Sequence, residues 1–308
     1  MSEKLNERYE YTNPTPLSGL SASYISIPES IIFDTSIDSK RVSVFSYLFM
    51  RKGMDNVAMF TIPSLVIWNG NKPDSHIGQI NEKYINIINI LKNKGYLSYE
   101  GTLSKTSCIG INFNYDKVCN ECKEQSFAIV YLDELYTIMN YKKKEKSDIR
   151  LSTSVVLLVF AFLRSSIYRR SNKLRPEEIN VDGSNNIEKD IIERKKIYPE
   201  AYDCRYIDIA KMIGIPSNTI SKAVDILKQL GLIVTDEGYR RKNKNGEYRT
   251  PNIIFANAYK REDKYLLASG EEYSRAEIEQ KVKKINRYFG GCYIINKNKR
   301  KKENDEQE

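Results

Sequence analysis

The sequence predicts an α+β fold in which one order of helices and paired strands occurs twice. The first observation is at residues 206–234, where apolar residues recur at helical spacing on both sides of Gly214, before a β-rich segment. The second is the Asn245-Gly246 pair, which is typical of a tight hairpin between two strands. The third is an internal repeat, because residues 91–97 (LKNKGYL) match residues 227–233 (LKQLGLI). In both copies a long helix is expected to end at glycine and to lead into a strand.

Residues 206–234 have the features of two helices that meet at a sharp turn. Ala210 is small where the helices must touch, and Gly214 permits the positive φ that such a turn requires. The second helix is expected to begin at Ser217 or Asn218, with Ser217 as its N-cap. The shared apolar seam is assigned to Ile209, Ile213, Ile215, Ile220 and Ala223. With this helical phase, the residues that point outward are Asn218, Thr219, Ser221, Lys222 and Asp225.

Two strands are expected after this helix pair, at residues 232–241 and 247–257. The hairpin between them carries basic residues opposed by one acid, Glu247; the basic residues are Arg240, Arg241, Lys242, Lys244 and Arg249. Such a hairpin is well placed to contact a phosphate backbone. The alternatives are that the hairpin is only solvated, or that the helix pair makes protein contacts alone.

The N-terminal half is expected to contain a related series of elements. The segments are a strand at 24–28, a helix at 39–51, a short helix at 63–68, a longer helix at 80–94 that ends at Gly95, and strands at 96–99 and 107–113. The second copy is expected to open with a strand and short helix at 127–139 and an apolar helix at 151–167. The copies differ by extra residues at 71–75 in the first and by a polar insertion at 172–204 in the second.

The predicted domain organisation has five parts. They are a flexible arm at 1–22, an N-terminal domain at 23–125, a C-terminal domain at 126–262 with the inserted loop 172–204, a helical appendage at 263–295, and a disordered charged tail at 296–308. The arm is polar and shows no hydrophobic period. A capping box from Ser274 to Glu277 predicts the helix of the appendage.

Composition favours a polyanionic partner and excludes several kinds of chemistry. The chain has 49 Lys and Arg against 40 Asp and Glu, a formal net charge of +9. Its single histidine, His76, excludes a multi-histidine metal site and the paired-histidine motif of rolling-circle nicking enzymes. The chain has no GxxxxGK[ST] motif, so ATP hydrolysis is not expected. No enzymatic activity, cofactor or metal is therefore assigned.

Cys119 and Cys122 have the one spacing that suits a metal ligand pair. A structural zinc site normally has two close pairs, so the favoured interpretation is that these cysteines lie in or beside a polar inter-domain connection and do no chemistry. A redox-sensitive pair is the alternative. The N-terminus lacks the apolar stretch of a secretory signal, and the longest apolar run, residues 155–163, is far short of a membrane span. A cytoplasmic protein without a membrane partner is expected.

On these residues, the 206–257 segment resembles a winged helix-turn-helix domain. Two such units in a basic chain, over about residues 24–258, resemble the replication initiators of theta-replicating plasmids and Gram-positive mobile elements. The resemblance implies an α+β fold of two tandem winged helix-turn-helix domains with a C-terminal helix and disordered tails. It is architectural, and only residues 206–234 carry a specific motif.

The resemblance also implies a function and contact residues. It implies site-specific binding of double-stranded DNA at repeated origin sites, with host replication proteins as further partners and either a monomer or a homodimer as the binding species. The implied DNA contacts in the second copy are Ser217, Asn218, Thr219, Ser221 and Lys222, with the basic hairpin. Weaker counterparts in the first copy are Asn81, Lys83, Tyr84 and Asn86. A transcriptional regulator with duplicated winged helices, or a non-catalytic scaffold that recruits replication or partition partners, would have nearly the same sequence features.

Overall fold

The computed structural model describes residues 23–74, 79–103, 107–141, 151–172, 201–237, 253–257, 259–261, 264–266, 272–280 and 282–283. These residues form a mixed α and β structure, in agreement with the predicted α+β class. They divide into two compact units, one from residues 1–166 and 207–230 and the other from residues 167–206 and 231–308.

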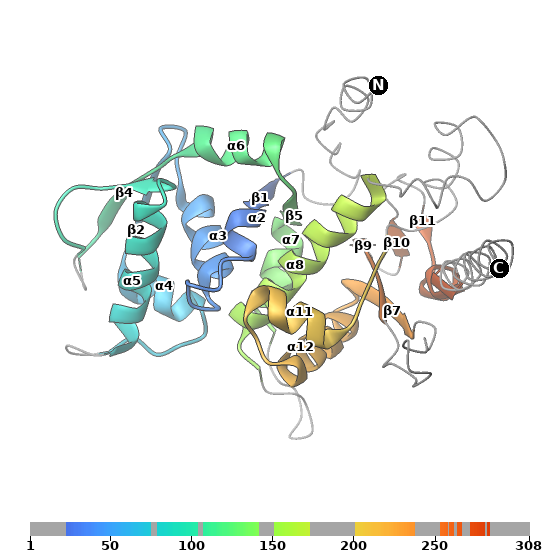
Figure 1. The fold of residues 1–308 in the computed structure, drawn as a ribbon. Coiled ribbons are helices and arrows are strands. Elements are labelled where there is room, and N and C mark those ends of the chain that lie inside the picture. The colour runs from blue at the N-terminus through green and yellow to red at the C-terminus, as the bar shows by residue number, and fades with distance from the viewer. Residues whose placement is uncertain are drawn as a thin grey trace, which may run out of the picture. The chain divides into compact units, whose positions relative to one another are not determined.

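The first unit contains most of the helices (Figure 1). Its elements are β1 (Tyr24–Pro28), α2 (Glu29–Ile32), α3 (Arg41–Arg51), β2 (Val57–Phe60), α4 (Ile62–Trp68), α5 (Gln79–Asn93), β3 (Leu97–Ser98), β4 (Ile109–Phe113), α6 (Tyr115–Glu124), β5 (Phe127–Tyr131), α7 (Leu132–Met139), most of α8 (Thr153–Asn172), and the helices α11 (Tyr206–Ile213) and α12 (Ser217–Gln229). The helices predicted at 39–51, 63–68, 80–94 and 151–167 are confirmed with small shifts of their ends.

The second unit contains short strands. They are β6 (Ala201–Cys204), β7 (Ile233–Glu237), β8 (Ile253–Asn257), β9 (Tyr259–Arg261), β10 (Lys264–Leu266) and β11 (Glu272–Tyr273). Residues 275–280 are helical, and the predicted capping box is present, because Ser274 N donates to Glu277 Oε2 at 2.7 Å and Glu277 N donates to Ser274 Oγ at 3.3 Å.

The order of elements along the chain occurs twice. The series α3-β2-α4-α5-β3-β4 has the same helix and strand types as α8-β6-α11-α12-β7-β8. The sheets match as well, with the order β2-β4-β3 in the first unit and β6-β8-β7 in the second. The two strands that open the copies, β1 and β5, pair with each other antiparallel from Tyr24 opposite Tyr131 to Pro28 opposite Phe127.

Aromatic packing holds α3 against the β2-β4-β3 sheet. The ring of Phe45 on α3 lies 5.3 Å from that of Phe113 on β4 and 6.0 Å from that of Tyr96, as measured between ring centroids. Edge-on and tilted aromatic pairs at these distances stabilise a core beyond the area that they bury. The turn after α5 is made by Gly95 with φ of +79°, as predicted for the end of this helix.

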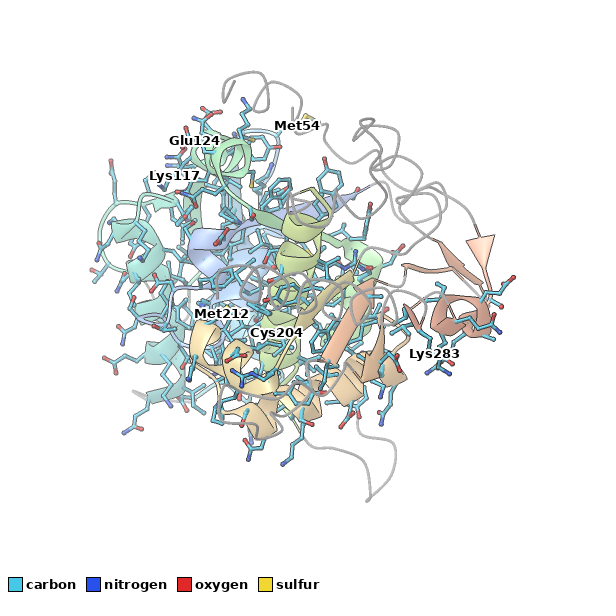
Figure 2. All side chains as sticks on the ribbon, turned by 45° about the vertical axis from the view of Figure 1, so that its right-hand side comes forward. Met54, Lys117, Glu124, Cys204, Met212 and Lys283 are labelled. Carbon is cyan, nitrogen blue, oxygen red and sulfur yellow. The ribbon has the colours of Figure 1, made fainter. Side chains whose placement is uncertain are left out.

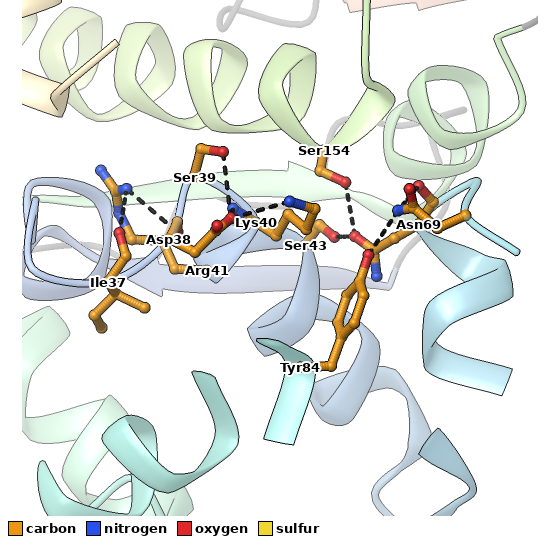
Figure 3. Close-up of polar contacts among 10 residues, drawn as sticks. Ile37, Asp38, Ser39, Lys40, Arg41, Ser43, Asn69, Tyr84 and Ser154 are labelled. Carbon is orange, nitrogen blue, oxygen red and sulfur yellow. Dashed lines mark hydrogen bonds and ion pairs between the residues drawn. The ribbon is translucent and has the colours of Figure 1, made fainter. Parts of the chain in front are cut away.

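Helix α8 is apolar on all sides along residues 156–163, and every one of these side chains is buried. This confirms the prediction of a buried helix. Its N-terminal end is joined to the first copy by Asn69, whose Oδ1 accepts hydrogen bonds from Ser154 of α8, at 2.7 Å, and from Ser43 of α3 (Figure 3). In the described part of the chain, no helix combines the length and apolar character needed to cross a bilayer.

Several elements differ from the sequence prediction. The segment around Cys119 and Cys122, for which no helix was predicted, is the helix α6. The predicted loop 172–204 is shorter, because residue 172 still belongs to α8 and residues 201–204 form β6; residues 173–200 lie outside the described residues. Strands β2, β6 and β9 to β11 were not predicted.

Candidate nucleic-acid interface

The pair α11 and α12 meets at the sharp turn that the sequence predicts. Gly214 has φ of +72°, a left-handed conformation that glycine adopts without steric cost. The amides of Gly214 and Ile215 both donate to the carbonyl of Ala210, at 3.0 and 3.2 Å, and so close the end of α11. The predicted apolar seam is buried, at Ile209, Ile213, Ile215, Ile220 and Ala223.

The first turns of α12 present a polar surface. Ser217, Asn218 and Lys222 are exposed, and Thr219, Ser221 and Asp225 are partly exposed, while Ile220, Ala223 and Val224 on the same helix are buried. The predicted outward face of this helix is therefore confirmed as solvent-accessible.

The N-cap prediction for Ser217 is wrong. Pro216 occupies the cap position, with φ of −56° and ψ of 142°, and its carbonyl accepts from Thr219 N at 2.9 Å and from Ile220 N at 3.1 Å. The fixed φ of proline suits it to this extended position, so Ser217 becomes the first helical residue. Its hydroxyl does not cap α12, and the residue is exposed to solvent.

The first copy offers a different surface on its corresponding helix, α5. Asn81 and Tyr84, predicted as exposed contacts, are buried, with exposed fractions of 3% and 1%. The prediction that these two residues are exposed is wrong, because the buried stripe of α5 begins earlier than the apolar residues alone indicate. It consists of Asn81, Tyr84, Ile87, Ile88 and Leu91.

Tyr84 is held in this buried position by a polar contact. Its hydroxyl accepts a hydrogen bond from Asn71 Nδ2 at 2.8 Å (Figure 3). Burial raises the pKa of Tyr84 to about 12. Asp74 caps the start of the same helix, since its Oδ2 accepts from the amides of Ile80 and Asn81 at 2.8 and 3.2 Å. Lys83 and Asn86 remain exposed on α5, together with Glu82, which the sequence prediction did not consider.

The basic hairpin lies outside the described residues. This applies to its cationic side chains, Arg240, Arg241, Lys242, Lys244 and Arg249, and to the Asn245-Gly246 turn. The strands on either side are described, and β7 pairs antiparallel with β8 from Ile233 opposite Asn257 to Glu237 opposite Ile253. The predicted pairing of the two strands is thus confirmed.

Cys119 and Cys122 lie one turn apart on α6. Burial raises the pKa of Cys122 to about 12, and the neighbouring Cys119 adds to this shift, so Cys122 is a thiol at neutral pH. Within the ranges that the structure describes, no group of three or more His, Cys, Asp or Glu side chains is arranged to hold a metal ion. His76 lies outside these ranges.

Helix α6 also borders a polar depression of about 520 Å³. Two of the side chains that line it, Lys117 and Glu124, come from this helix (Figure 2). Glu121 lines the same depression but is already engaged. Its carboxylate pairs with Lys117 Nζ at 2.6 Å and accepts from the hydroxyls of Ser30 and Tyr96, each at 2.5 Å. Burial acts to raise the pKa of Glu121, but these contacts outweigh it and lower the pKa below its usual value. The cluster therefore joins α6 to α2 and to the start of the β3 region.

No protein-family model matches this chain, and comparisons with curated proteins and with solved structures found no significant similarity. Function is therefore inferred from the element order and from the exposed side chains.

Proposed function

We propose that this protein binds double-stranded DNA at specific sites through two tandem winged-helix domains, and that it initiates replication of a plasmid or related mobile element. The observation that carries the proposal is α12, whose polar first turns are exposed while its apolar side is buried. A helix that follows a sharp turn and presents such residues at its start suits the major groove. Asn218 is suited to contact a base edge and Lys222 a base or a phosphate.

The repeated order of elements supports two such domains in one chain. Each copy supplies three helices and a three-stranded sheet in which the last strand lies in the middle. In this arrangement α5 is the counterpart of α12. Lys83 and Asn86 are its remaining candidates for DNA contact, since Asn81 and Tyr84 are buried. Glu82 next to them would repel phosphate, so the second copy carries most of the proposed base contacts.

The charge of the chain supports a polyanionic partner. With a formal net charge of +9 and a basic hairpin at 240–249, association with DNA should weaken steeply as salt rises, because bound counterions are released. The hairpin would contact the backbone beside the groove that α12 enters, and so add affinity without adding sequence preference.

The first test is a nuclease footprint of the purified full chain, at near-physiological salt, on the intergenic DNA that flanks its own gene. Several protected direct repeats beside an AT-rich tract are expected for an initiator. A single or inverted site over a promoter would instead favour a transcriptional regulator. Absence of protection on any DNA would contradict DNA binding and favour a scaffold that recruits protein partners.

Base contact by α12 is tested with a matched pair of variants on the same helix. Asn218→Ala, at the start of α12, should lose about 1–3 kcal/mol of discrimination at particular base pairs. Gln229→Ala, at the other end and also exposed, should leave the site preference unchanged. The measurement is the affinity for the protected site and for its single-base-pair variants. An equal loss on all sequences for Asn218→Ala would show that this residue does not contact bases.

A further inference from the structure

The loop between α2 and α3, residues 33–40, contacts the end of α5 and the turn that precedes α12. These are the two helices proposed to contact DNA. This segment is called the bridging loop below. All of its contacts described here lie within the first compact unit.

On one side the bridging loop binds the end of α5. Asp34 Oδ2 lies 2.5 Å from Nζ of Lys94, the first residue after α5. Asp34 Oδ1 also accepts from the amide and hydroxyl of Ser36, at 3.0 and 2.5 Å, so the carboxylate is held from both sides. The side chain of Asp34 is mostly buried, with 13% exposed, which reduces the solvent screening of this ion pair compared with an exposed one.

On the other side the bridging loop and Arg41 contact the turn that precedes α12. Arg41 Nη2 donates to the carbonyl of Ile213, at 3.0 Å, and to that of Ile32, at 2.8 Å. The same guanidinium donates through Nε to Ile31 O at 2.9 Å and, as Figure 3 shows, through Nη1 to Ile37 O at 3.2 Å. Arg41 is 1% exposed, so these carbonyls replace water around the cation.

Gly214 adds a steric contact at the same place. A Cβ atom built on Gly214 would lie 3.0 Å from Cγ2 and 3.3 Å from Cβ of Thr35 in the bridging loop. The turn between α11 and α12 is therefore in close contact with the loop. Only three residues separate Ile213, which accepts from Arg41, from Ser217 at the start of α12.

We infer that the bridging loop and Arg41 fix α12 relative to α5, so that the two helices recognise a DNA site of one fixed spacing. Arg41 is a positioning residue in this scheme, because it acts through the turn before α12 and is itself buried. The DNA part of this inference rests on the proposed function. Two flexibly linked modules would tolerate a change of spacing, whereas a fixed pair would lose most of the gain from binding twice. Each inserted base pair moves one half of the site by roughly 3.4 Å and rotates it by roughly 34°.

The coupling itself is tested without DNA. Azide-bearing amino acids at Lys83 and Gln229, both exposed, would carry donor and acceptor dyes in the full chain for single-molecule energy transfer. The unaltered bridging loop should give one narrow distribution of transfer efficiency. Arg41→Lys retains the charge but loses the planar guanidinium that donates to four carbonyls at once, so it should broaden or shift the distribution.

A second variant covers the case in which Arg41→Lys does not fold. Lys94→Gln removes the ion pair with Asp34 at a half-exposed position, and it should broaden the same distribution. Lys92→Gln is the matched control, because Lys92 Nζ donates to Tyr99 O at 2.8 Å and does not contact the bridging loop in the contacts described here. Distributions that stay as narrow in both test variants as in the control would overturn the inference.

The consequence for DNA is tested with duplexes enriched by the full chain from a random 40-base-pair pool, then altered by insertion of five base pairs between the two protected segments. The protein should lose roughly 100-fold in affinity, at the low end of the gain from joined binding modules, and Arg41→Lys should lose clearly less. An equal loss in both would show that Arg41 only stabilises the fold. If no duplex is enriched, the proposed function fails, while the energy-transfer experiment still decides whether the bridging loop couples the helices.

Discussion

The buried ion pair between Glu134 and Arg164 allows a quantitative prediction about stability. The two side chains are 4% and 3% exposed, and Arg164 Nη2 donates to Glu134 Oε1. Glu134 Oε2 also accepts from Tyr131 N, at 3.1 Å, at the start of α7. The pair therefore joins α7 to α8 in the core of the first unit.

Glu134→Gln should be strongly destabilising, because it leaves the guanidinium of Arg164 buried without its carboxylate. Removal of one partner of a buried pair typically costs about 3–5 kcal/mol. For a cooperative unit of 150–250 residues, this corresponds to a fall in melting temperature of roughly 6–20 °C. The assay is thermal unfolding of the full chain followed by circular dichroism, with Glu124→Gln as an exposed control on α6.

The combination Glu134→Leu with Arg164→Met separates the cost of the lone charge from the value of the pair. Because apolar residues of similar size often replace a buried pair without loss, the double variant should be more stable than Glu134→Gln. A loss below about 1 kcal/mol for Glu134→Gln, within the range of exposed pairs, would refute the reasoning. So would a double variant that is less stable than the single one.

Three further predictions concern pH, backbone conformation and salt. Because the folded-state pKa of Glu121 is lowered, its contribution to stability is present above its unfolded pKa of about 4.3 and is lost as pH falls through the folded value; Glu121→Gln should flatten the fall in melting temperature between pH 6 and 3, and an unchanged acid limb would contradict this. Gly214→Ala should lower the free energy of unfolding by about 1–2 kcal/mol because of its positive φ, and by a further amount because of the close contact with Thr35. Gly101→Ala, at a similar φ with open space around it, should show the backbone cost alone. Equal losses for the two variants in denaturant titrations would show that the contact is unimportant. Replacing the basic residues 240–242 by alanine should make the negative slope of log affinity against log salt concentration shallower by up to about 2.7. An unchanged slope would show that the hairpin does not contact DNA.

The sequence predicted the helix pair at 206–229 well, because its information is local. Apolar spacing located the buried seam, and Gly214 located the turn, so α11 and α12 were found almost to the residue. The prediction of Ser217 as the N-cap failed because proline and serine both suit the start of a helix. The ψ of 142° at Pro216 is not helical, so Pro216 is the cap and Ser217 is the first helical residue.

Other features could not be predicted because they depend on contacts between distant residues. Helix α6 has only one buried residue, Val118, and therefore no apolar period to detect. Asn81 and Tyr84 are polar residues that are buried by tertiary packing, as the hydrogen bond from Asn71 shows for Tyr84. Arg41 is a single basic residue at the start of a helix, and its role depends on a carbonyl 172 positions further along the chain.

The pairing of β1 with β5 affects the folding of the chain during synthesis as well as the stability of the folded protein. Ile25 and Ile27 of β1 are buried, yet the strand obtains its hydrogen-bonding partner only when Phe127–Tyr131 has been synthesised. At about 5–20 residues per second, the hundred or so intervening residues take roughly 5–20 s to translate. During that interval β1 is an unpaired apolar strand, the kind of edge that associates with other chains. A fragment that ends before Phe127 would retain this exposed edge permanently, so the first copy needs the opening strand of the second in order to be complete.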